Sequence, residues 1–121
     1  MNSTRLTDAN MKHFGNAISL NALPGLKRLD LNNVSQGPPN NKSITTVGWN
    51  HLIKALEKGA LPSLTDLYIQ NNSFTDNQIE TWVRALSKQS TLPLLKDLCL
   101  NNNNMQKFKP VGNARKNLTI D

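Results

Sequence analysis

The stretch LPSLTDLYIQNN, residues 61–72, decides the fold of this chain because the chain spells it three times. One near-copy, LPGLKRLDLNN, occupies residues 23–33, and another, LPLLKDLCLNN, occupies residues 92–102. Self-similarity of this kind is the signature of an architecture built from stacked units. In the central copy Leu67 and Ile69 alternate with polar neighbours, so each copy is predicted to form a short strand with one buried face.

A helical pattern precedes each copy. LTD, ITT and FTD open the preceding stretches, and threonine or aspartate is well suited to cap a helix. After each opening, apolar or small residues recur at i, i+3, i+4 and i+7, the spacing of one helix face. These residues are Met11, Phe14, Gly15 and Ile18, then Trp49, Leu52, Ile53 and Leu56, then Ile79, Trp82, Val83 and Leu86. The chain is therefore predicted to hold three helix-plus-strand units, at about residues 6–34, 44–72 and 74–105.

A single unit cannot cover its own apolar side, so the units must stack, with parallel strands on one surface and helices on the other. The pattern L-x-x-L-x-L-x-x-N-x-L in these units resembles the leucine-rich repeat. Two units meet it, through Leu64, Leu67, Ile69, Asn72 and Phe74 and through Leu95, Leu98, Leu100, Asn103 and Met105. The first unit departs from it, because Val34 takes the asparagine position. A full helix in each unit makes the chain similar to the ribonuclease-inhibitor-like class of that family.

This resemblance implies one α/β domain over residues 1–121. The domain would be a short leucine-rich-repeat solenoid, a right-handed αβ superhelix with parallel strands on the concave face and helices on the convex face. The resemblance also implies that Asn72 and Asn103 lie inside the turn after each strand, where their amides bond backbone groups of adjacent coils.

Extra sequence interrupts the first unit. Leu29 and Leu67 are 38 positions apart, whereas Leu67 and Leu98 are 31 apart. The additional residues are assigned to SQGPPNNKS, residues 35–43, whose composition predicts a protruding loop. This loop is interpreted either as a binding element or as a tolerated insertion.

The repeat also fails in the basic C-terminal segment, residues 106–121, which is predicted to be irregular. Pro110 and Gly112 stand where a fourth helix should run. Two interpretations stay open. Leu118 and Ile120 form a fourth strand after a non-helical connection, or the segment is an extended basic arm that orders on a partner.

Chemical motifs give no support for catalysis. The chain has no glycine-rich phosphate loop, no H-E-x-x-H and no paired cysteines. His13 and His51 take equivalent positions in successive helices, but Thr81 stands there in the third unit, so no metal site is expected. Cys99 lies at an outward strand position with no histidine predicted on that face, so it is interpreted as a contact residue. We therefore expect neither enzymatic activity nor a cofactor.

Composition bears on where the protein works. A hydrophobic content of 37% suits a globular protein, and a single cysteine without an apolar leader predicts an intracellular, cytoplasmic chain. The apolar runs fall short of the roughly 18 residues that a membrane span requires, so no membrane partner is expected.

The leading functional hypothesis is a non-catalytic protein-interaction module that presents its polar strand face to a partner protein, alone or within a larger complex. The outward positions are Arg28, Asp66 and Asp97 in one row, Asp30, Tyr68 and Cys99 in the next, and Asn32, Gln70 and Asn101 in the third. Tyr68 lies at the centre and is the best single anchor, because tyrosine is enriched at interface hot spots.

The alternative is a small basic subunit or adaptor of a large assembly, such as a ribonucleoprotein, anchored through its C-terminal segment. A net charge of +6 favours acidic partners, including nucleic acid. The basic residues of that segment are Lys107, Lys109, Arg115 and Lys116.

The ends of the stack carry a further expectation. No polar cap precedes the first unit, so apolar area near Met11, Phe14 and Leu29 is predicted to be exposed. Such a patch favours self-association or dependence on a partner.

Overall fold

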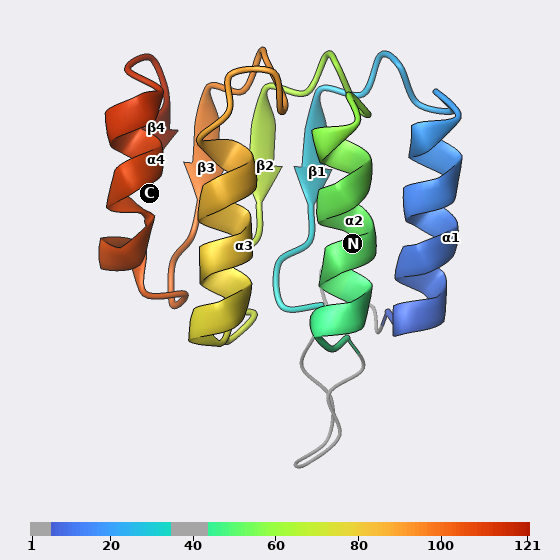
Figure 1. Ribbon diagram of the computed structural model, residues 1–121, viewed down its shortest axis with the longest axis horizontal. Coiled ribbons are helices and arrows are strands. Elements are labelled where there is room, and N and C mark those ends of the chain that lie inside the picture. The colour runs from blue at the N-terminus through green and yellow to red at the C-terminus, as the bar shows by residue number, and fades with distance from the viewer. Residues whose placement is uncertain (1–5, 35–43) are drawn as a thin grey trace.

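The computed structural model describes residues 6–34 and 44–121, in which helices and strands alternate. The strands form one parallel sheet in the order β1-β2-β3-β4. They are β1 (Arg28–Asp30), β2 (Asp66–Tyr68), β3 (Asp97–Cys99) and β4 (Thr119–Ile120). The helices are α1 (Asp8–Ser19), α2 (Thr46–Glu57), α3 (Asp76–Leu86), the 3-10 helix η1 (Met105–Phe108) and α4 (Lys109–Ala114). Figure 1 shows the helices side by side in one layer, with the strands in a second layer behind them.

The predicted α/β class with parallel strands is confirmed, and a helix and a strand fall within each predicted unit. The predicted superposition of Leu29, Leu67 and Leu98 is the observed register, and Ile120 extends it to β4. The loop predicted at residues 35–43 lies outside the described residues.

Threonine caps the N-terminus of each of the first three helices, in agreement with the sequence prediction. The hydroxyls of Thr7, Thr45 and Thr75 each accept a hydrogen bond from a backbone N–H of the first turn. In α1 and α3 the side chains of Asn10 and Gln78 accept a bond from the threonine N–H in return, which completes a capping box. These caps satisfy N–H groups that have no partner within the helix.

Asp8 links α1 to the start of α2. Its Oδ1 accepts hydrogen bonds from the N–H groups of Thr45, at 2.8 Å, and Gly48, at 3.1 Å, and its Oδ2 accepts one from the Thr45 hydroxyl at 2.6 Å. A Cβ at position 48 would lie 2.3 Å from Asp8 Oδ1, so only glycine lets the carboxylate approach this closely. The contact fixes how the first two helices pack.

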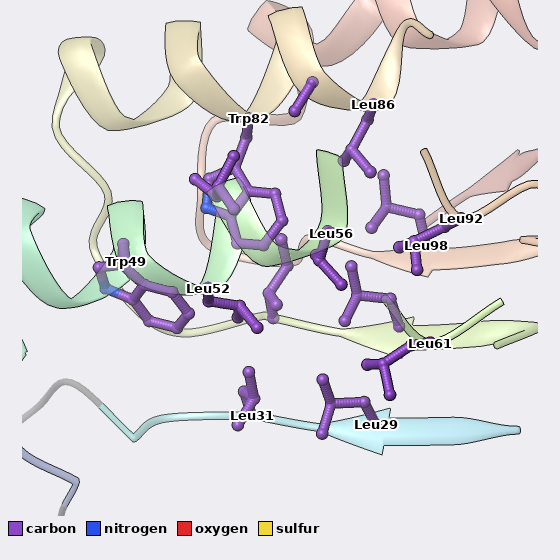
Figure 2. Close-up of a cluster of buried hydrophobic side chains, with 14 of the residues drawn as sticks. Leu29, Leu31, Trp49, Leu52, Leu56, Leu61, Trp82, Leu86, Leu92 and Leu98 are labelled. Atoms are coloured by element: carbon purple, nitrogen blue, oxygen red, sulfur yellow. The ribbon is translucent and has the colours of Figure 1, made fainter. Parts of the chain in front are cut away.

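The core lies between the helix layer and the sheet. Trp49 and Trp82 are 1% and 0% exposed, and the Trp49 ring meets Phe74 edge-on, with centroids 5.0 Å apart. In Figure 2 the tryptophans and neighbouring helix leucines face strand residues such as Leu29 and Leu98. Both tryptophans, which the sequence placed on the apolar faces of their helices, are therefore core residues.

Two buried asparagines connect successive strands, as the resemblance implied. Asn72 Nδ2 donates to the carbonyl of Leu31 at 2.9 Å, and Asn72 Oδ1 accepts from the N–H of Val34 at 3.0 Å. Asn103 repeats the pattern one strand further on, with the carbonyl of Ile69 and the N–H of Asn72. Val34 itself is fully buried, so an apolar side chain replaces the asparagine in the first unit.

The C-terminal segment is more regular than the sequence predicted. Its strand is confirmed, because β4 pairs in parallel with β3. The non-helical connection is wrong, because η1 and α4 precede β4. Pro110 is the second residue of α4, where a missing N–H does no harm, since the first turn has no internal acceptor for it.

The predicted exposure at the start of the stack is wrong for two of its three residues. Met11 is 1% exposed and Leu29 is 8% exposed, while Phe14 is half-buried. Leu6 and Phe14 pack against the core at this end and leave a cavity of about 90 Å³ beside these side chains. The first unit therefore covers most of its own flank.

Candidate functional site

The sheet face that points away from the helices gathers all nine predicted contact residues. Leu29, Leu67 and Leu98 point into the core, so their neighbours along each strand point to the opposite face. Strand pairing places Arg28, Asp66 and Asp97 in one row, and Asp30, Tyr68 and Cys99 in the next. Both rows match the sequence prediction.

The third row continues beyond the strands. Gln70 accepts a hydrogen bond from the N–H of Asn33 at 3.0 Å, and Asn101 accepts one from the N–H of Asn71 at 2.9 Å. These backbone bonds keep Asn32, Gln70 and Asn101 in step with the rows before them. The result is a polar surface three strands wide, named here the strand face.

Tyr68 occupies the middle of the strand face. The guanidinium carbon of Arg28 lies 4.2 Å from the centre of its ring, a cation–π contact. Arg28 Nη2 also lies 3.9 Å from Asp30 Oδ2. The cation–π contact with Arg28 restricts the motion of the Tyr68 ring. The ring is half-buried, so it presents a rigid, amphipathic surface to a partner.

Charge is unevenly spread over the strand face. Asp66 and Asp97 are direct neighbours on adjacent strands, where like charges repel. Arg28, on the other side of Asp66, is the cation of the same row. A partner that brings a cation to the β2–β3 side of this row would relieve the repulsion.

Side-chain amides border the strand face where the strands end; the sequence prediction included Asn32 but missed Asn71 and Asn102. Asn71 Nδ2 donates to Asn32 Oδ1 at 2.8 Å, and Asn102 Nδ2 donates to Asn71 Oδ1. Asn33, Asn71 and Asn102 share the left-handed conformation, with φ of 57°, 62° and 67°. The doublet NN, present in all three copies, is the signal that could have found this row, because asparagine tolerates positive φ better than most residues.

Cys99 and the two histidines lie on opposite sides of the sheet. Cys99 is half-buried on the strand face, and the amide of Asn101 lies 4.0 Å from its sulfur. His13 and His51 lie on α1 and α2, on the helix side of the sheet. Within residues 6–34 and 44–121, no three His, Cys, Asp or Glu side chains come together in a group that could hold a metal ion.

The four basic residues of the C-terminal segment do not form one patch. Arg115 is only 4% exposed, so it is not available as a surface cation, and burial lowers the pKa of its guanidinium. Lys107 is paired with Asp76 at 2.6 Å. Lys109 is exposed at the start of α4, and Lys116 is exposed in the turn between α4 and β4. The predicted basic anchor therefore retains two of its residues as unpaired surface cations within the described part of the chain.

Comparison of the chain with known protein families and with curated proteins found no match. No helix in the described ranges has the length and apolar character needed to cross a membrane.

Proposed function

We propose that this chain is a leucine-rich-repeat protein of the ribonuclease-inhibitor-like class, and that it binds a partner protein through the strand face without catalysing a reaction. The observation that carries the proposal is the in-register display of polar residues around Tyr68. The repeated L-x-x-L-x-L pattern, the parallel strands and the helix layer are what such a solenoid requires, with the strand face as its concave surface.

Rigidity supports this function. The backbone beneath the strand face is fixed by strand pairing and by the amides of Asn72 and Asn103. A surface that is already ordered loses little entropy when it binds, which favours affinity. The cation–π contact with Arg28 limits Tyr68 in the same way.

The partner should complement the charges of the strand face. Asp66 and Asp97 favour a lysine or arginine of the partner, and Arg28 favours a carboxylate one strand away. Tyr68, between these charges and the amides, suits an apolar or aromatic anchor.

The alternative of a basic anchor in a ribonucleoprotein gains no observation of its own. β4 takes up the end of the segment, Arg115 is buried and Lys107 is paired, so the extended-arm interpretation of residues 106–121 is wrong.

The test starts from the partner captured by the wild-type chain. Its affinity is then measured for Tyr68→Ala, for Asp66→Ala and for the control Lys54→Ala, an exposed position on α2. Tyr68→Ala should weaken binding by about 1–3 kcal/mol while the circular dichroism spectrum is kept, and Lys54→Ala should change nothing. If Tyr68→Ala and Asp66→Ala both leave the affinity unchanged, the strand face is not the binding site.

A further inference from the structure

The four connections that lead from a helix to the next strand lie along one edge of the molecule, at the top of Figure 1. They comprise residues 20–27, 58–65, 87–96 and 115–118, and together are named here the connection edge. The connection edge contains six basic residues and no aspartate or glutamate. The basic residues are Lys27, Lys58, Lys88, Lys96, Arg115 and Lys116.

Most of the positive charge of the connection edge is exposed and can contact a ligand. The five lysines are exposed, and among residues 6–34 and 44–121 Lys88 alone of these five forms an ion pair, with Glu57 at 3.0 Å. Arg115 is buried, and the hydrogen bonds of its guanidinium go to neutral carbonyls, so no carboxylate cancels its charge. The connection edge is thus a strip of positive potential on a chain whose eight acidic residues all lie elsewhere.

Large apolar side chains protrude from the same edge. Leu20 is 84% exposed, Leu23 is 42% exposed and Leu94 is 51% exposed. They are three of the five large hydrophobic side chains that are exposed in the described ranges. Leucines set among lysines match a ligand that carries both negative charge and apolar groups.

A pocket of about 220 Å³ opens between the third and fourth connections. Pro93, Leu94, Leu95 and Leu118 give it apolar walls, and Lys96 and Lys116 stand among its lining residues, none of which is acidic. Its size suits one bulky apolar side chain, with carboxylates reaching the two lysines. A pocket of this shape favours a polypeptide over a flat lipid surface.

Nucleic acid fits this edge less well. Surfaces that bind single strands combine basic groups with aromatic side chains on which bases stack. The connection edge contains no phenylalanine, tyrosine or tryptophan.

We propose that the connection edge binds an acidic protein segment that inserts one bulky apolar side chain into this pocket and places carboxylates on Lys96 and Lys116. This is a second interaction surface, separate from the strand face, and it does not depend on the function proposed there.

The probe is a synthetic peptide of aspartates and glutamates around one central leucine, with binding measured by fluorescence polarisation and by NMR shifts. Lys96→Glu with Lys116→Glu should weaken binding by about tenfold or more, because two attractive charge contacts become repulsive. The matched control is Lys12→Glu with Lys54→Glu, which makes the same charge change on exposed positions of α1 and α2. The control pair and Tyr68→Ala should each retain binding within about twofold.

A second peptide, with alanine in place of the central leucine, tests the pocket. It should bind about fivefold more weakly, since the apolar contact is lost. The proposal is overturned if the two peptides bind equally, or if the control pair loses as much affinity as the pair at the pocket. It is also overturned if a uridine homopolymer or anionic vesicles bind through Lys96 and Lys116 while the leucine peptide does not.

Discussion

Replacing Arg115 with methionine is the sharpest test of how the C-terminal segment is held. The guanidinium Nη1 donates to the carbonyls of Leu86, at 3.1 Å, and Thr91, at 2.6 Å, and Nη2 donates to the carbonyl of Leu92. These carbonyls lie at the end of α3 and in the connection that follows it. The side chain therefore ties residues 115–118 to the previous unit and neutralises the negative end of that helix.

The expected loss of stability follows from these hydrogen bonds. A hydrogen bond to a charged group contributes about 1.5–3 kcal/mol, and methionine loses the three bonds above, a longer fourth one to the carbonyl of Lys88 at 3.4 Å, and a cation at a helix C-terminus. Methionine fills similar space and removes the need to bury a charge, which offsets part of the loss. We expect the free energy of unfolding to fall by about 2–4 kcal/mol, a large share of the roughly 5–15 kcal/mol of a typical domain.

Urea denaturation followed by circular dichroism measures the change, with the m-value checking that both proteins unfold alike. Lys116→Met is the control, since its side chain is exposed and should shift stability by no more than about 0.5 kcal/mol. Arg115→Lys should fall between, because an ammonium keeps the charge but cannot span the same carbonyls. If Arg115→Met is as stable as the wild type, the guanidinium does not hold the segment and the reasoning is wrong.

Three further changes test other contacts. Gly48→Ala should lower the free energy of unfolding by about 1–3 kcal/mol, because the new Cβ would meet Asp8 Oδ1 at 2.3 Å. In an Asp8→Ala background the same change should cost less, and equal losses in both backgrounds would contradict the predicted clash. Asn103→Ala should lower the free energy of unfolding by about 2–3 kcal/mol, because it removes the amide that donates to the carbonyl of Ile69 and accepts from the N–H groups of Asn72 and Phe74; thermal unfolding measures the loss, and a neutral result would deny that the amide is structural. Removal of residues 118–121 should lower Tm and promote aggregation by exposing the edge of β3, and an unchanged Tm would show that β4 is dispensable.

The sequence predicted the fold well where one signal was repeated. The alternation around Leu67 and the helix spacing around Trp82 each recur in three copies, so the copies fix one another's register and hence the rows of the strand face. Proline signals were less decisive. Pro110 predicts that no helix runs through this segment, yet it falls in the first turn of α4, where proline is tolerated.

The contacts that the sequence could not supply are tertiary. Nothing local to Arg115 indicates that carbonyls from residues 86–92 converge on it, so the sequence predicts an exposed cation at this position. The gathering of Leu20 and Leu94 with lysines on one edge likewise depends on the stacking of distant loops. The sequence predicted which residues form the candidate surface, but it did not predict the partner. The rows of the strand face indicate the charge and shape that a partner should have, and many proteins could have them.

The bonds of the buried asparagines have a direction, and it bears on how the chain is made. The amide of Asn72 reaches back to Leu31 and Val34, and that of Asn103 reaches back to Ile69 and Asn72, so each strand is completed by the one synthesised after it. During synthesis the N-terminal strand emerges first. The backbone groups that still lack an asparagine partner therefore lie at the most recently made strand, where water can still bond them. Assembly can follow synthesis one unit at a time, and no earlier strand has to be displaced to admit a later one.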